Sequence, residues 1–221
     1  MESPQYESKT IEELKLCKDQ NKGISKLNKD KLIVKLSNHI MPSLDLYTKS
    51  VLCKRFYTYK TNFIDLLDLK KTTGLPIRQE NPPEDITENI VKFILHKGDD
   101  PSSKWAKSMK EKGDLVSEKY FCPEVKSFTS NGPSSFGPKK VFGIIYFLDL
   151  RKWLDDIIIL WKVNLSSDSL EWKNLKMNKT QTNQDQCNEK RRPHISWDNI
   201  YEQLKPHCQQ IYNGTFEGIF P

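Results

Sequence analysis

The chain has 221 residues, which is enough for one full domain and a small additional module. Its net charge of +6 permits a polyanionic partner without requiring one, and its 36% share of hydrophobic residues indicates long polar loops. The first residues lack a secretory signal, no apolar run approaches the length of a membrane span, and five scattered cysteines form no disulfide framework. We therefore expect an intracellular protein that is neither secreted nor bound to a membrane.

The first segment of the chain, residues 1–41, predicts two short helices. One covers residues 10–22, with a capping box at its start and Gly23 at its end. The other covers residues 29–39 and is expected to end before Pro42. An extended link, ISKLN, joins them.

This segment, ELKLCKDQNKGISKLNKDKLIVKL, resembles the SAP motif, a helix-extended-helix module that binds duplex DNA. The likeness rests on intervening lysines and on Leu14, Gly23, Leu27, Leu32, Ile33 and Leu36. It implies that residues 1–41 form a SAP-like module that binds DNA, with Lys26 and Lys29 among the contacts. A helical hairpin with a solvated lysine face is the alternative.

Residues 42–80 predict a helical connector, with its helix over about 43–69. Gly74 and the prolines that follow it mark a break, so we place the main domain at residues 81–221. This domain begins with a helix over residues 83–97, which starts near a proline, carries acidic residues in its first turn and ends at a glycine.

The run GDLVSEKYFCPEVKSFTS, residues 113–130, combines an alternating apolar pattern with charged residues. It predicts two antiparallel strands, and Glu124 and Lys126 point to the same side because side chains alternate along a strand. Asp114, at the start of the partner strand, is expected to share that side. Two carboxylates can hold Mg²⁺, and a neighbouring ammonium can orient an attacking water, which is the outline of a phosphodiesterase site. A hairpin with solvated charges is the alternative.

The spacing of Asp114, Glu124 and Lys126 resembles the signature of the PD-(D/E)XK nuclease superfamily, with Gly113 in place of the signature's proline. The loop SNGPSSFGP and the strands IIYFLD and IIILWKVNL resemble the core of type II restriction endonucleases carried by bacteria and large DNA viruses. This likeness covers about residues 83–205. It implies an α/β fold with a restriction-endonuclease-like core, in which helices flank a mixed central sheet, beside the small helical N-terminal module. It also implies that all three motif residues are catalytic and that the two carboxylates bind Mg²⁺.

The helix before the sheet can add a glutamate to the metal site in such folds. Glu84 and Glu88 are the candidates here, one helical turn apart, and we favour Glu88. Either could instead cap or solvate the helix.

Two polar regions are expected to contact DNA. Shortly after the catalytic strand, Ser134, Ser135, Lys139 and Lys140 suit backbone phosphates. The later segment KNLKMNKTQTNQDQCNEKRRPHISW combines cations for phosphates with amides for base edges. The candidates in it are Lys179, Thr180, Gln181, Thr182, Gln184, Arg191 and Arg192. A flexible solvated loop is the alternative for this segment.

The sequence therefore predicts a Mg²⁺-dependent, sequence-specific endonuclease that hydrolyses double-stranded DNA and leaves 5′-phosphates, as the resemblance implies. Palindromic cutting calls for a homodimer, and a restriction function implies a DNA methyltransferase as a separate protein. The expected location is the cytoplasm of a bacterium, or the host cell or virion if the protein is viral. Two alternatives stay open: a non-catalytic DNA-binding protein, and a repair or junction nuclease on the same fold.

Overall fold

The described part of the computed structural model comprises residues 29–76, 82–106, 113–131 and 133–220. The predicted DNA contact Lys26, the side chain of Lys29 and most of the SAP-like module lie outside the described part. The chain divides into two compact units, Met1–Val51 and Leu52–Pro221. All elements named below except the first part of helix α2 belong to the second unit.

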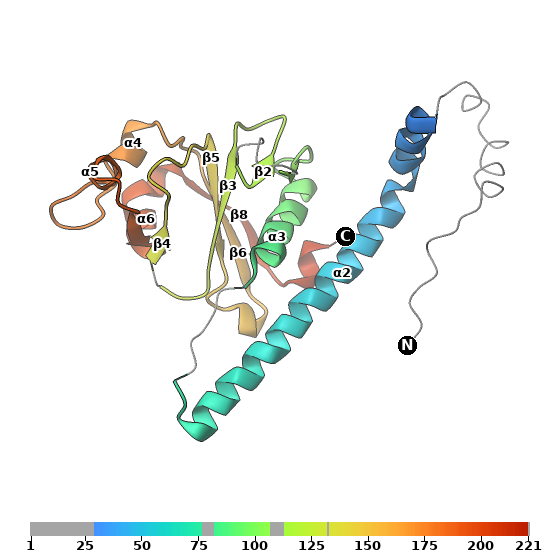
Figure 1. Ribbon diagram of the computed structural model, residues 1–221, viewed down its shortest axis with the longest axis horizontal. Helices are drawn as coiled ribbons and strands as arrows, with labels where there is room; N and C mark the ends of the chain where they lie inside the picture. Colours follow the sequence, from blue (N-terminus) through green and yellow to red (C-terminus); the bar gives the residue numbers. More distant parts are fainter. Residues whose placement is uncertain (1–28, 77–81, 107–112, 132, 221) are drawn as a thin grey trace. The chain divides into compact units, whose positions relative to one another are not determined.

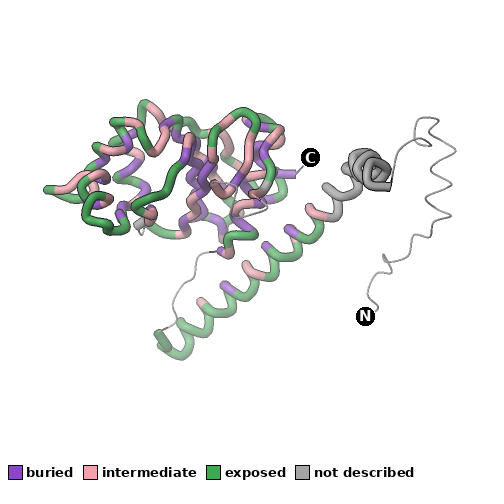
Figure 2. The backbone as a smooth tube through the Cα atoms, turned by 45° about the horizontal axis from the view of Figure 1, so that its top comes forward, coloured by how far each residue is buried: buried purple, intermediate pink, exposed green. Residues whose placement is uncertain are grey.

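Helix α2 covers Lys29–Thr73 without interruption, so the predicted helix end before Pro42 is wrong. A proline removes one hydrogen bond from a helix interior, but the helix can continue past it. In the second half of α2, the buried residues Leu52, Phe56 and Phe63 recur among exposed ones (Figure 2). They pack in the same core as the sheet, so residues predicted to form a separate connector contribute to the second unit.

A mixed sheet of four strands forms the centre of the second unit (Figure 1). The strands lie in the order β3, β5, β6 and β8, with bounds Pro123–Phe128, Ile144–Asp149, Ile158–Val163 and Cys208–Gly214. β3 runs parallel to β5, and the other neighbouring pairs are antiparallel. Helices flank the sheet, which confirms the predicted α/β fold class with a restriction-endonuclease-like core.

Alternation along β5 divides the core into two apolar layers. Tyr146 and Leu148 pack in the layer of α3, which covers Glu84–Lys97, and Phe147 packs in the layer of α6, which covers Trp197–Leu204. Figure 1 shows these two helices on opposite faces of the sheet. A strand covered on both faces is apolar throughout, which explains the run IIYFL.

Smaller elements complete the unit. Two antiparallel pairs join β1 to β2 and β4 to β7, with bounds Lys104–Trp105, Leu115–Val116, Pro133–Ser135 and His194–Ser196. The short helices α4 and α5 cover Leu170–Lys173 and Asn183–Asn188. The 3-10 turns η1, η2 and η3 cover Trp153–Asp155, Lys205–His207 and Glu217–Ile219. Among the helices of the described part, none has the length and apolar character needed to cross a membrane.

Strand pairing near the predicted catalytic run differs from the expected hairpin. β2 pairs with β1 and not with β3. Pro123 has no N–H to donate to a ladder, and Cys122 before it has a φ of 44°, so the chain bends sharply where β3 begins. β8 was not predicted; it is an edge strand that follows helix α6, which ends at Leu204, and the 3-10 turn η2.

Candidate active site

A glycine allows Asp114 to lie directly against β3. Gly113 has a φ of 90°, a left-handed conformation that favours glycine, and a Cβ at this position would lie 2.8 Å from the carbonyl oxygen of Pro123. The N–H of Asp114 donates to that same oxygen at 3.0 Å. The Asp114 carboxylate in turn accepts a hydrogen bond of 2.8 Å from the N–H of Val125. The left-handed glycine before Asp114 therefore allows this close approach of the carboxylate to β3.

Glu124 lies at the centre of a cluster of four charged groups. Its side chain is 0% exposed, and its oxygen Oε1 lies 2.7 Å from Nζ of Lys126. Its other oxygen, Oε2, lies 2.7 Å from Nζ of Lys140. The same Lys140 Nζ lies 3.3 Å from Oδ1 of Asp114. The three motif residues predicted from the sequence thus meet, and Lys140 joins the two acids.

The electrostatics follow from burial and from these contacts. Burial raises the pKa of Glu124 and the neighbouring Asp114 charge adds to this effect, while Lys126 and Lys140 oppose it. Burial works against the charge of Lys140, but the Glu124 and Asp114 carboxylates outweigh it and raise the pKa of Lys140. The two lysines therefore supply the positive charge that a buried carboxylate requires.

Glu88 on α3 belongs to the same electrostatic neighbourhood. Burial, reinforced by the charges of Asp114, Glu84 and Glu124, raises the pKa of Glu88 to about 7, and Lys140 opposes this shift. Glu84 is exposed, whereas Glu88 is half-buried. Of the two candidate glutamates, Glu88 is therefore the one that is less exposed to solvent.

The donor set can be compared with what Mg²⁺ requires. In the described residues, no three Asp, Glu, His or Cys side chains gather closely enough to form a ready-made metal site. Asp114 and Glu124 nevertheless approach one another closely enough for a single ammonium to touch both. Mg²⁺ usually keeps several waters and is bound through one or two carboxylates, so these two side chains fit it.

Comparison with known proteins identifies a family for this chain. A family model described as Bsp6I restriction endonuclease matches residues 43–203. The chain belongs to the Bsp6I restriction endonuclease family. No curated protein and no solved structure matches it. Family membership makes DNA the substrate class and endonuclease cleavage the activity, and the matched region contains the whole cluster around Glu124 but not residues 1–41.

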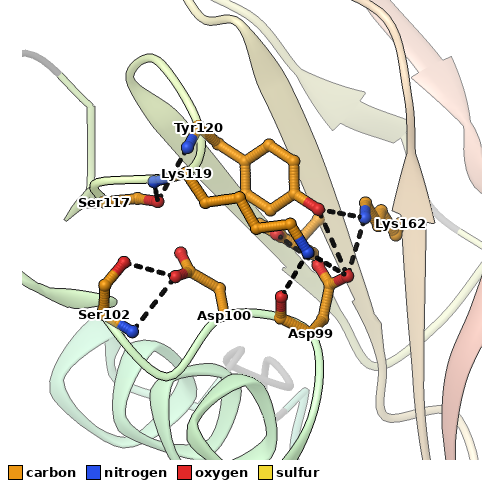
Figure 3. Close-up of polar contacts among 8 residues, drawn as sticks. Asp99, Asp100, Ser102, Ser117, Lys119, Tyr120 and Lys162 are labelled. Carbon is orange, nitrogen blue, oxygen red and sulfur yellow. Dashed lines mark hydrogen bonds and ion pairs between the residues drawn. The ribbon is translucent and has the colours of Figure 1, made fainter.

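In this Bsp6I-family chain, a second polar cluster anchors the segment that connects Asp114 to Glu124 (Figure 3). Lys162 stands on the central strand β6 with its side chain only 7% exposed, and its Nζ lies 2.8 Å from Oδ1 of Asp99. Lys162 also donates to the hydroxyl of Tyr120 at 2.6 Å. Tyr120 and Tyr146 each donate to the Asp99 carboxylate, at 3.2 and 3.1 Å. Because Tyr120 lies between Asp114 and Glu124 in the sequence, this cluster holds the segment between the two acids against the sheet.

Backbone contacts hold the same segment at further points. The Ser117 hydroxyl accepts from the N–H groups of Lys119 and Tyr120 (Figure 3). The Ser102 hydroxyl accepts from the N–H of Glu118. Sequence reasoning did not find this cluster. The available signal was Lys162 itself, since a charged residue within the apolar strand IIILWKV requires a buried partner.

The residues predicted to contact phosphates after the catalytic strand have different environments. Ser134 is buried on β4, Ser135 is half-buried and Lys139 is exposed. The ammonium of Lys140 contacts the carboxylates of Asp114 and Glu124, so its charge is already paired within the protein. Lys139 therefore remains the clearest phosphate candidate of the four.

The later polar segment is an internally hydrogen-bonded loop. Thr182 and Asp185 form a capping box at the start of α5, and the Asn178 side chain accepts from two backbone N–H groups. The Gln181 side chain bonds Asn178 and Glu189, and Arg191 donates to Gln181 and Glu189. Gln184 donates to Asn188. Thr182 and Gln181 thus use their polar groups within the loop, while Lys179, Thr180 and Arg192 are exposed on it.

Proposed function

We propose that this protein is a Mg²⁺-dependent type II restriction endonuclease of the PD-(D/E)XK type, which cuts double-stranded DNA at a specific sequence. The observation that carries the proposal is the buried Glu124, which lies 2.7 Å from Lys126 and shares Lys140 with Asp114. Restriction endonucleases typically use a divalent metal, and this chain offers two carboxylates and an ammonium in one place.

The residues would divide the chemistry as follows. Asp114 and Glu124 would hold Mg²⁺, which supplies Lewis-acid stabilisation of charge on the phosphate and acidifies water. Lys126 orients the attacking water and stabilises the negative charge of the transition state. The water oxygen forms a bond to phosphorus, the P–O3′ bond breaks and O3′ takes up a proton, which leaves a 5′-phosphate and a 3′-hydroxyl. Glu88 is a candidate third acid of the metal site.

Recognition would use residues outside the catalytic cluster. The exposed cations Lys139, Lys179 and Arg192 suit phosphates or base edges, and the hydrogen-bonded loop around α5 gives them a fixed frame. A palindromic site would require a homodimer, because a two-fold DNA site matches a two-fold protein. A partner methyltransferase and DNA binding by the SAP-like module at residues 1–41 complete the proposal.

Plasmid digestion with purified full-length protein tests the catalytic assignment. Wild-type protein, Lys126→Ala and the control Lys205→Ala, which removes an exposed lysine of η2, would be compared with Mg²⁺ and with EDTA. We expect discrete Mg²⁺-dependent bands from the wild type and the control, and none from Lys126→Ala. Removal of the lysine should lower the cleavage rate by at least about 100-fold, since one lost transition-state donor costs about 10²–10³ in rate.

Each other outcome has a separate meaning. A smear in place of bands would contradict sequence specificity and favour a repair or junction nuclease on this fold. Undiminished cleavage by Lys126→Ala would refute the assigned role of that residue. DNA binding without cleavage by the wild type, on unmethylated DNA of varied sequence, would refute catalysis and leave a DNA-binding protein.

A further inference from the structure

Lys140 reaches the catalytic acids from outside the motif. It lies in the turn that follows β4, where its N–H donates to the carbonyl of Gly137 at 3.0 Å. From there its Nζ contacts Oε2 of Glu124 at 2.7 Å and Oδ1 of Asp114 at 3.3 Å. An ammonium thus stands between two carboxylates that are the expected ligands of a divalent cation.

We propose that Lys140 is a built-in counter-cation of the active site, which occupies the place of the divalent metal in the metal-free protein and is displaced when the metal binds. This inference rests on the proposed nuclease function. Two neighbouring carboxylates repel each other, and the nearby acid Glu88 adds to the repulsion. One ammonium in contact with both offsets that repulsion. A dication cannot use the same oxygens while the ammonium stays, because the two cations would repel each other at contact distance.

The two lysines of the site differ in their freedom to leave. Lys126 stands on β3, two residues from Glu124, so its backbone is fixed beside its partner. Lys140 stands on a turn, and its side chain is 36% exposed against 27% for Lys126. A lysine is a compact charge on a flexible stem, which allows Lys140 to withdraw without a change in the sheet.

A cavity beside the site can receive the displaced ammonium. It has a volume of about 170 Å³ and lies between the turn that carries Lys140 and the start of α5. Lys139, Lys173, Ser167, Asp168 and Gln184 are among its lining residues. Asp168 offers a carboxylate there, and a DNA phosphate near Lys139, Lys140 and Lys173 would offer a second acceptor. The displaced charge would therefore not be left without a partner.

Metal binding without DNA tests this inference directly. The probe is Mn²⁺, whose free concentration is measured by electron paramagnetic resonance while it is titrated into full-length protein. We compare the wild type with Lys140→Met, which keeps the length of the side chain and removes its charge, with Lys140→Arg, which keeps the charge, and with the control Lys139→Met. We expect Lys140→Met to bind Mn²⁺ about tenfold more tightly or better, since a like charge in contact with the metal position is removed. Lys140→Arg and Lys139→Met should stay close to the wild type.

The opposite result would show that Lys140 holds the acids in place and does not compete with the metal. Unchanged or weaker Mn²⁺ binding by Lys140→Met, with a thermal unfolding midpoint near that of the wild type, would overturn the inference. A Lys140→Arg variant as tight as Lys140→Met would also overturn it, because the effect would then not follow the charge. Wild-type cleavage measured on the same preparations separates this failure from a failure of the nuclease proposal.

Discussion

Replacement of Gly113 by alanine should distort the position of the first catalytic acid. The residue has a φ of 90°, and an added Cβ would lie 2.8 Å from the carbonyl oxygen of Pro123 and 3.0 Å from the carbonyl carbon of Cys122. A strained left-handed residue costs about 1–3 kcal/mol, and loss of the hydrogen bond from Asp114 to Pro123 adds about 1 kcal/mol. We therefore expect Gly113→Ala to lower the free energy of unfolding by about 2–4 kcal/mol. Gly113→Pro, which restores the residue of the signature, should do no better, because proline fixes φ near about −65°.

Two other glycines separate the causes of this effect. Gly74 also has a positive φ, 68°, but a Cβ there would meet no atom within 4 Å, so Gly74→Ala measures strain alone. A Cβ at Gly98 would also lie in open space, and its φ of −151° lies outside the left-handed region, so Gly98→Ala adds neither the steric clash nor the left-handed strain. Urea unfolding of all three variants would give the comparison, and plasmid cleavage would follow the function. A Gly113→Ala protein within about 0.5 kcal/mol of the wild type, which is typical of neutral surface changes, would refute the reasoning.

Three further predictions concern charge and packing. Lys162→Met should destabilise the protein by about 2–3 kcal/mol in urea unfolding, which is less than the 3–5 kcal/mol typical of a broken buried pair, because Asp99 keeps its tyrosine donors. The double variant Lys162→Met with Asp99→Asn should recover most of this loss. Additive effects of the two substitutions would contradict the pairing. Glu88 has a pKa of about 7 in the folded state against 4.5 ordinarily, so the folded state binds more protons between these pH values and loses stability as the pH rises. After allowance for solvent screening, Glu88→Gln should therefore have a free energy of unfolding about 1–2 kcal/mol above the wild type at pH 8 and almost equal to it at pH 4. Equal gains at both pH values would contradict this interpretation. Phe56→Ala should lower the free energy of unfolding by about 3–4 kcal/mol, because this buried ring stacks on Phe216 with the ring centroids 3.8 Å apart. Leu66→Ala, at an exposed position of the same helix, should lower it little. Equal losses would contradict the packing of the second half of α2 in the core of the second unit.

Periodicity predicted the parts of the site that depend on one strand. Glu124 and Lys126 share a side of β3 because they are two residues apart, and their contact of 2.7 Å follows from that spacing. The apolar run IIYFLD was expected to form a strand, and in β5 every one of its residues is buried. Helix α3 agrees with its predicted bounds because a proline precedes it and a glycine follows it.

Long-range pairing and unusual backbone geometry could not be predicted in this way. Asp114 reaches β3 through a turn that depends on the positive φ of Gly113, and no periodic pattern encodes such an approach. Lys140 enters the site from a turn after β4, so its sequence distance from Glu124 gave no indication of contact. The edge strand β8 carries few apolar residues, which left it without a period-2 signal of its own.

The catalytic geometry therefore depends on residues that the signature does not contain. The two acids are ten positions apart in the sequence, and the segment between them is held by Asp99 and Lys162, which lie far from it in the chain. Lys162 stands on the central strand, so its charge fixes Tyr120, and through it the segment, relative to the rigid part of the sheet. Because a nucleophile or metal ligand displaced by about 1 Å can lose about 10²-fold in rate, loss of this anchor should lower the cleavage rate by about 10²-fold while Asp114, Glu124 and Lys126 are all present. Under the proposed function, the presence of Asp114, Glu124 and Lys126 consequently does not by itself ensure an active enzyme.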